Sequence, residues 1–159
     1  MITQSRLLEL FNYQDGQLVR KVKCGRMPAG SIAGYKAQNG YVIVRVDNAY
    51  HLLHRLIFLM HKGVLPSNID HINRNPSDNR IENLREATLT QNQGNRKQDH
   101  RNKSGFRGVV WNKKRAKWQA QIGINGKSKY LGIFDTAEEA YLKYCQEAEK
   151  HFDGYANLK

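Results

Sequence analysis

Residues 68–95, NIDHINRNPSDNRIENLREATLTQNQGN, have the polar composition of a surface loop, but they place an acid, an imidazole and two amides at defined spacings. Asp70 and His71 are adjacent. Asn83 follows twelve positions after the histidine, and Asn92 follows nine positions after that. Hydrolysis of a phosphodiester needs an activated water, neutralisation of charge at phosphorus and stabilisation of the leaving 3′ oxygen. A base and a bound metal ion can together meet these needs.

The residue types indicate which side chain has which role. A neutral imidazole can accept the proton of the attacking water near pH 7, and we assign this role to His71. Carboxylate and carbonyl oxygens suit Mg²⁺ or Mn²⁺, which commonly keep some waters and bind substrate phosphate directly. Asp70 and the side-chain carbonyl of Asn92 therefore predict a platform for one Mg²⁺ or Mn²⁺ ion per active site, with no small-molecule cofactor. Cys24 and Cys145 are far apart and disfavour a zinc site.

The charge of the 159-residue chain indicates a polyanionic partner. The chain contains 26 Lys and Arg against 14 Asp and Glu, for a formal net charge of +12. Such a balance makes nucleic acid the leading candidate for that partner. A membrane is disfavoured because no apolar run approaches 18 residues and no basic amphipathic helix is present. The N-terminus lacks a basic start followed by an apolar run, so we expect a cytoplasmic protein.

The basic residues are concentrated in one stretch, which suggests where the chain divides. Residues 95–134 carry 11 basic side chains and 1 acidic side chain. This stretch begins with the apolar-poor segment NRKQDHRNKSG at 95–105, which is typical of a solvated linker. We therefore expect a first module at 1–94, a basic linker at 95–104 and a second module at 105–159.

The second module has the pattern of a small sheet and one helix. Runs rich in β-branched and aromatic residues at 106–111, 117–124 and 129–134 predict three antiparallel strands. Asn125-Gly126 favours a tight hairpin turn between the last two, because both turn positions need positive φ. Residues 135–152 predict an amphipathic helix against one face of the sheet. Its apolar stripe consists of Ala137, Ala140, Tyr141, Tyr144, Ala148 and Phe152.

This half of the chain resembles the AP2 DNA-binding domain from about Gly105 to Leu158. The similarity is carried by Arg107-Gly108-Val109, Trp118-x-Ala120-x-Ile122 and Tyr130-Leu131-Gly132-x-Phe134-Asp135-Thr136-x-Glu138-Glu139-Ala140. The resemblance implies that the sheet enters the major groove, with the positions of Arg107, Val110, Gln121, Gly123, Ser128 and Tyr130 facing DNA. Gln119 and Gln121 can form paired hydrogen bonds with an adenine edge. The expected phosphate contacts are Arg107, Lys113, Lys114, Arg115, Lys117, Lys127 and Lys129.

The first module must hold Asp70 and His71 in place. Adjacent residues on a strand point to opposite faces, so each can have a different role. The segment YHLLHRLIFLMHKGVLP at 50–66 predicts an apolar strand or the start of a helix, followed by a turn. Residues 80–95 predict a polar helix around Ile81, Leu84 and Leu89. Residues 1–48 predict short strands in a small sheet that supports the site.

The site residues resemble the HNH nuclease motif, and in particular the phage HNH homing endonucleases in which asparagine replaces the last histidine. The resemblance spans about 40–95 and is carried by His54-Arg55, Leu65-Pro66, Asp70-His71-Ile72, Asp78-Asn79-Arg80-Ile81, Asn83-Leu84-Arg85 and Gln91-Asn92. It implies that Asp70 and Asn92 bind the metal and that His71 is the general base. It also implies that Asn83 braces the loop and orients the histidine. For His54 we expect a buried, hydrogen-bonded role that supports the site.

We therefore predict an α+β chain. A small N-terminal β region leads into a ββα-metal HNH motif, and an AP2-like three-stranded sheet with one helix follows. The predicted activity is metal-dependent, site-specific cleavage of double-stranded DNA by a phage-encoded homing endonuclease in a prokaryotic cytoplasm. One motif per chain predicts a monomer or weak dimer that nicks one strand per encounter. The alternative is a DNA-binding regulator that retains an inactive nuclease scaffold, whereas an RNA-binding protein would need exposed stacking aromatics.

Overall fold

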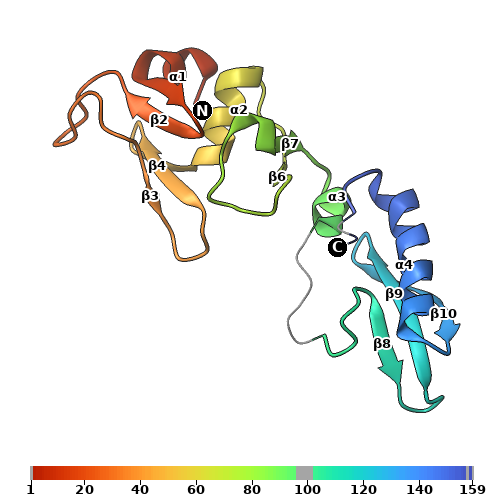
Figure 1. The fold of residues 1–159 in the computed structure, drawn as a ribbon. Coiled ribbons are helices and arrows are strands. Elements are labelled where there is room, and N and C mark those ends of the chain that lie inside the picture. The colour runs from red at the N-terminus through yellow and green to blue at the C-terminus, as the bar shows by residue number, and fades with distance from the viewer. Residues whose placement is uncertain (1, 96–101, 157, 159) are drawn as a thin grey trace. The chain divides into compact units, whose positions relative to one another are not determined.

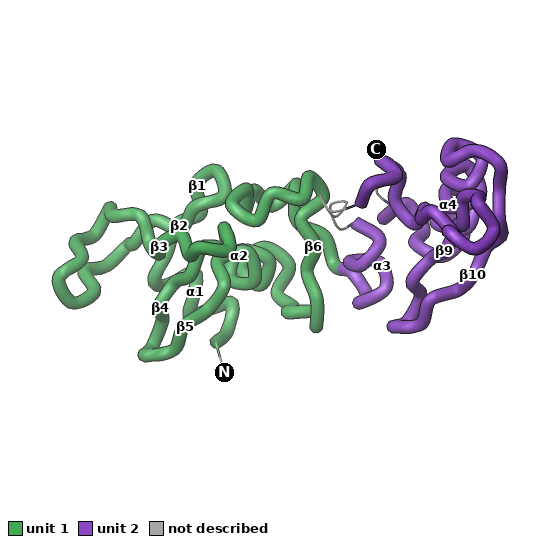
Figure 2. Tube along the Cα trace, turned by 90° about the horizontal axis from the view of Figure 1, so that it is seen from below, with its two compact units in different colours: residues 1–86 green, residues 87–159 purple. Residues whose placement is uncertain are grey.

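The computed structural model describes residues 2–95, 102–156 and 158 (Figure 1). Contacts divide the chain into two compact units, which are coloured separately in Figure 2. Unit 1 comprises residues 1–86 and unit 2 comprises residues 87–159. Most of the predicted linker, residues 96–101, lies outside the described residues. None of the helices in the described part of the chain is long and apolar enough to cross a membrane.

The N-terminal part of unit 1 contains the predicted short strands. Its elements are α1 (Gln4–Leu10), β1 (Phe11–Gln14), β2 (Gln17–Arg20), β3 (Tyr35–Lys36), β4 (Val42–Val46), β5 (Ala49–Leu52) and α2 (Leu53–Lys62). Strands β1 and β2 form an antiparallel hairpin, and β3, β4 and β5 form a separate antiparallel sheet in that order. Asp15 and Gly16 make the hairpin turn with φ of 50° and 79°, as a turn of this kind requires.

The two helices of unit 1 pack around one hydrophobic core. The sequence pattern does not predict α1, which has seven residues. Thr3 caps this helix by accepting a hydrogen bond from the Arg6 amide at 3.2 Å, and Leu7 anchors it in the core. Helix α2 follows β5 directly, so segment 50–66 contains both a strand end and a helix. Its buried side chains are Leu53, His54, Leu56, Ile57, Phe58, Leu59 and Met60.

A second hairpin follows α2 and carries the Asp-His pair. Its elements are β6 (Ile69–His71), the 3-10 turn η1 (Ile81–Asn83) and β7 (Leu84–Glu86). Strands β6 and β7 are antiparallel, and their register places Arg85 opposite Asp70. The loop of residues 72–80 joins β6 to η1, so Asp70 and His71 lie where this long polar loop leaves the strand.

The prediction of one helix over residues 80–95 is wrong. Residues 84–86 pair with β6 as a strand, and helix α3 (Leu89–Gly94) begins only afterwards. Thr88 caps α3, and a capping box with Gln91 satisfies the first backbone amides of the helix. The pattern predicts Leu89 as one of the apolar positions of a helix. Its side chain is instead 67% exposed, so it does not contribute to a core.

Unit 2 confirms the predicted sheet and helix. After α3 it contains β8 (Val109–Asn112), β9 (Lys117–Ile124), β10 (Lys127–Phe134) and α4 (Ala137–Phe152). The sheet is antiparallel with the order β10-β9-β8. Asn125 and Gly126 form the turn with φ of 51° and 76°. Thr136 and Glu139 form the capping box that starts α4.

Only one face of this sheet is covered by α4. Ala120 and Ile122 on β9 are buried in clusters with side chains of α4. Because neighbouring residues on a strand alternate, Gln119 and Gln121 point to the opposite face. The strand register adds further residues to that face. We call it the open sheet face, and its members are Val110, Asn112, Lys117, Gln119, Gln121, Gly123, Ser128 and Tyr130.

Candidate active site and nucleic-acid interface

The pair of Asp70 and His71 is buried although it belongs to a polar segment. The side chains lie on β6, and the two residues are 5% and 6% exposed. The carboxylate Oδ2 of Asp70 accepts a hydrogen bond from Nε of Arg85 at 3.0 Å and forms an ion pair with that guanidinium at 2.9 Å. The strand register brings Arg85 into this position, and a buried carboxylate needs such a partner.

A hydrogen bond to Asn79 orients the His71 ring. The Nε2 atom of His71 lies 3.2 Å from Oδ1 of Asn79. The Nδ2 amide of Asn79 donates to the Ser77 carbonyl at 3.2 Å, which leaves Oδ1 as the acceptor. Nε2 of His71 must then carry the hydrogen, so the lone pair of the neutral ring is on Nδ1.

The surroundings of His71 favour its neutral form. Burial lowers the pKa of His71 below the ordinary 6.5, while the hydrogen bond with Asn79 and the charges of Asp70 and Asp78 act in the opposite direction. The net direction is downward, so the ring is largely unprotonated near pH 7. An unprotonated imidazole is the form that can accept a proton from water.

His54 lies beside His71 in the buried part of the site. The two ring centroids are 5.0 Å apart, and the ring of Tyr41 lies near both, with its centroid 5.5 Å from that of His54 and 6.0 Å from that of His71. Burial lowers the pKa of His54 to about 3, with smaller contributions from His71 and Arg55. The Nδ1 atom of His54 is buried and has no hydrogen-bond partner in the described structure. The expected hydrogen bond is thus absent at this atom.

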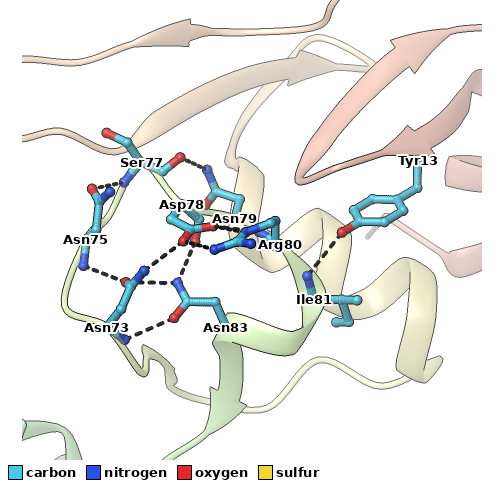
Figure 3. A network of polar contacts seen from close by, with 9 residues as sticks. All are labelled: Tyr13, Asn73, Asn75, Ser77, Asp78, Asn79, Arg80, Ile81 and Asn83. Carbon is cyan, nitrogen blue, oxygen red and sulfur yellow. Dashed lines mark hydrogen bonds and ion pairs between the residues drawn. The ribbon is translucent and has the colours of Figure 1, made fainter.

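Asn83 joins the two ends of the loop between the strands (Figure 3). Its Oδ1 accepts from the Asn73 amide at 2.9 Å, and its Nδ2 donates to the Asp78 carbonyl at 2.8 Å and to Oδ1 of Asn73 at 3.0 Å. These bonds fix the loop that carries Asn79. Asn79 contacts the His71 imidazole, and Asn83 is linked to Asn79 through this loop.

The far side of the same loop is fixed by an ion pair and by strand β1. Arg80 donates to both carboxylate oxygens of Asp78 at 2.9 and 2.8 Å, which holds the pKa of Asp78 well below its usual range. The Ile81 amide donates to the hydroxyl of Tyr13 at 3.1 Å. Gly16 also lies against this loop. A Cβ atom at this position would be 2.7 Å from the backbone nitrogen of Arg80.

The predicted metal ligands come from the two compact units. Asp70 lies on β6 of unit 1, and Asn92 lies on α3, which packs against α4 in unit 2. Their joint binding of a metal stays a prediction. No cluster of three or more His, Cys, Asp or Glu side chains suited to a metal occurs among the described residues. The donor chemistry of one carboxylate and one amide oxygen fits Mg²⁺, which commonly takes its other ligands from water and phosphate.

Gln119 and Gln121, which are predicted to contact base edges, form a row of amides with Asn112 on the open sheet face. The Nδ2 amide of Asn112 donates to Oε1 of Gln119 at 3.0 Å, and Nε2 of Gln119 donates to Oε1 of Gln121 at 3.3 Å. These two hydrogen bonds order the amide side chains across β8 and β9. Amides held in this way can present donors and acceptors to base edges.

The basic residues of unit 2 have different surroundings. Lys113, Lys114 and Arg115 are exposed in the β8–β9 turn, and Lys127 is exposed at the start of β10. Lys117 forms an ion pair with Asp135 at 2.8 Å. Lys129 and Arg107, which are also predicted to contact phosphates, bind other groups of the protein. Lys129 lies in register with Ile122 on the helix side of the sheet, where it pairs with Glu147 at 3.0 Å. Arg107 donates from its guanidinium to the carbonyl oxygens of Gln93 and Gly94.

The comparisons with known proteins bear out both family resemblances. Residues 51–93 match the family described as HNH endonuclease, and residues 104–151 match the AP2 domain. The chain is 34% identical to Protein 3.8 of Escherichia phage T7 over 83 residues. This alignment covers 52% of this chain and 69% of that protein. It is 35% identical over 125 residues to the uncharacterized HNH endonuclease L560 of Acanthamoeba polyphaga mimivirus, which covers 77% of this chain and 64% of that protein. No solved structure matches significantly.

A buried Asp-His pair on a hairpin and a sheet-and-helix DNA-binding fold thus occur in one chain. The chain belongs to the HNH endonucleases, and its HNH domain is followed by an AP2 DNA-binding domain.

Sequence reasoning did not assign Asn79 or Arg85 to the site. Asn79 stands within the family segment Asp78-Asn79-Arg80, but spacing alone does not show which amide meets the imidazole. Arg85 becomes the partner of Asp70 only through the register of β6 and β7. A hairpin prediction for residues 69–86 could have found it, because that pairing places an arginine opposite the acid.

Proposed function

We propose that the protein is a metal-dependent, site-specific endonuclease of the homing type that hydrolyses phosphodiester bonds in double-stranded DNA. The observation that carries this proposal is the buried imidazole of His71, held through Nε2 by Asn79 beside the carboxylate of Asp70. Nδ1 of His71 accepts a proton from the attacking water, because the ring is neutral and Nε2 is already a donor. The Asn79 hydrogen bond stabilises the imidazolium that forms.

Asp70 and the side-chain oxygen of Asn92 would hold one Mg²⁺ or Mn²⁺ ion. When bound, the ion neutralises charge on the phosphate and on the leaving 3′ oxygen. Arg85 fixes the Asp70 carboxylate, which is nearly removed from solvent. Asn83 and the loop around it keep Asn79 in reach of His71.

Unit 2 supplies affinity for DNA through its open sheet face. Gln119 and Gln121 contact base edges in the major groove, and their mutual hydrogen bond prepares them for paired contacts. The exposed side chains of Lys113, Lys114 and Arg115 contact phosphates. Lys127 and Lys117 extend this basic surface.

One HNH motif per chain cuts one strand at a time, so we propose that the protein nicks DNA as a monomer or weak dimer. The T7 relative is a phage protein, which supports action in the cytoplasm of a prokaryotic host.

The experiment is cleavage of a supercoiled plasmid library that contains randomised duplex inserts, with Mg²⁺ or with EDTA. The expected result is open-circular DNA in Mg²⁺ alone, with linear DNA appearing later and with a preferred sequence at the sequenced ends. His71→Ala should abolish nicking while DNA affinity is retained. Undiminished nicking by His71→Ala would refute the proposed base, and binding without nicking by the wild type would favour a DNA-binding regulator.

A further inference from the structure

Helix α3, which carries Asn92, is built into the DNA-binding unit. Gly94, its last residue, lies against the ring of Phe152 at the end of α4, and a Cβ atom at position 94 would be 2.6 Å from Cγ of Phe152. Phe152 is itself buried in a cluster with Ile122 and Tyr144. The C-terminal end of α3 therefore packs directly on the core of the AP2 fold.

The same end of α3 is bound by a guanidinium group. Nη1 of Arg107 donates to the Gly94 carbonyl and Nη2 donates to the Gln93 carbonyl, both at 2.6 Å. The last carbonyl groups of a helix have no partners within the helix, and they form its negative end. An arginine with two parallel donors is well suited to this position, and hydrogen bonds from a charged group are strong.

The backbone next to Arg107 determines where this guanidinium points. Gly108 has a φ of 72°, and a Cβ atom there would be 2.2 Å from the ring of Tyr144 on α4. The chain can approach α4 this closely only because residue 108 is glycine. At the other end of α3, Thr90 donates a hydrogen bond to the side chain of Asn125 in the β9–β10 turn. Contacts within unit 2 therefore hold α3 at both ends.

We propose that Arg107 is a positioning residue that holds α3, and with it Asn92, on the AP2 fold. Its guanidinium serves the carbonyl groups of α3 and makes no phosphate contact. This inference rests on the proposed function, in which Asn92 is a metal ligand. It makes the cleavage activity dependent on an intact DNA-binding domain, because that domain sets the position of a residue needed for chemistry.

The test compares Arg107→Ala with Arg115→Ala in the full-length protein. Hydrogen exchange at the amides of Asn92 and Asn95 reports on α3, since they donate to the carbonyls of Thr88 and Gln91. Arg107→Ala should increase exchange at both amides and lower single-turnover cleavage at saturating DNA by about 10-fold or more. In Arg107→Ala, the slope of log DNA affinity against log salt should equal the wild-type slope. Arg115→Ala should show normal exchange and a salt slope smaller by about 0.9.

Two further variants keep the outcome decisive. Gly94→Ala should increase α3 exchange as Arg107→Ala does, because it forces the helix end away from Phe152. Arg107→Lys should give an intermediate increase, since lysine keeps the charge but loses the paired donors. A reduced salt slope with normal α3 exchange in Arg107→Ala would overturn the inference and make Arg107 a phosphate contact. If the wild-type protein does not cleave DNA, the proposed function fails, but the exchange and salt measurements still decide the role of Arg107.

Discussion

Oδ1 of Asn79 lies 3.2 Å from Nε2 of His71, and the amide of the same asparagine is held by the Ser77 carbonyl. The imidazole is thereby fixed with Nδ1 as its basic atom. The orientation of the proposed base depends on a residue of the loop and on the hydrogen bonds that hold this loop.

Replacing Asn79 with leucine should impair chemistry more than binding. The change removes the acceptor for Nε2 without a large change in volume, so the ring loses its fixed orientation. We expect the single-turnover cleavage rate to fall by about 10- to 100-fold, with DNA affinity nearly unchanged. Nitrogen NMR of labelled His71 should show a changed tautomer population. Asn79→Asp retains an acceptor and should recover part of the rate, and a rate equal to wild type in Asn79→Leu would exclude this role.

Cleavage should depend on pH through His71. Because burial lowers the pKa of His71 below 6.5, the base stays active through neutral pH and is lost as pH falls through that lowered value. In Asn79→Asp the added negative charge favours the imidazolium, so the acid limb should move to higher pH. Single-turnover rates over about pH 4 to 9 test both statements. An acid limb above pH 6.5 in the wild type would contradict the first.

His54 should make the protein less stable in acid. Its pKa of about 3 in the folded state lies below the ordinary 6.5, so the unfolded chain binds the proton more readily. Stability from the neutral ring is complete above pH 6.5 and is lost as pH falls toward 3, at about 1.4 kcal/mol per pH unit. His54→Leu should flatten this dependence in urea unfolding measured at several pH values. An unchanged acid dependence in the variant would assign it to other groups.

Removing the basic side chains of the β8–β9 turn should weaken DNA binding most at low salt and lower its dependence on salt. Lys113, Lys114 and Arg115 are exposed in the β8–β9 turn, and each phosphate contact contributes about 0.9 to the slope of log affinity against log salt. The triple alanine variant should therefore lose nearly three from this slope. Fluorescence anisotropy with a labelled duplex between low and physiological salt measures it. An unchanged slope would place the phosphate contacts on another surface.

Gly16→Ala should destabilise the loop that orients His71. Gly16 has a φ of 79°, and the added Cβ would lie 2.7 Å from the Arg80 nitrogen, so strain and a clash add together. Gly25→Ala provides the matched control, since its φ of 58° is also positive but nothing lies within 4 Å of the new atom. We expect Gly25→Ala to cost about 1 kcal/mol of unfolding free energy and Gly16→Ala distinctly more. Equal losses in urea unfolding would show that the clash is relieved at no cost.

Local signals were sufficient to predict much of the fold. Asn125-Gly126 specifies its turn through positive φ at both positions, and Thr136 with Glu139 specifies the start of α4, so neither needs information from distant residues. The Asp70-His71 pair is predicted on a strand because a turn at Gly63 to Pro66 precedes it and a long polar loop follows. Each of these features depends on neighbours within a few positions.

The features that were missed depend on distant partners. Residues 84–86 lie in a segment whose apolar spacing predicts a helix, but their pairing with β6 makes them a strand. Asn79 and Asn83 look alike in sequence, and only the folded loop shows which one reaches the imidazole. Arg107 is a basic residue in a basic stretch, and its two carbonyl partners lie 13 and 14 positions earlier in the chain.

The packing of α3 on the AP2 fold limits where such proteins can recombine their domains. Gly94 fits against Phe152, and Arg107 serves the carbonyls of Gln93 and Gly94, so the helix and the AP2 fold share one set of complementary surfaces. A chimera joined after Asn95 would attach α3 to a foreign domain that lacks these surfaces. A functional recombination joint therefore belongs before Ala87, so that the donor of a new targeting specificity also contributes the last helix of the nuclease motif.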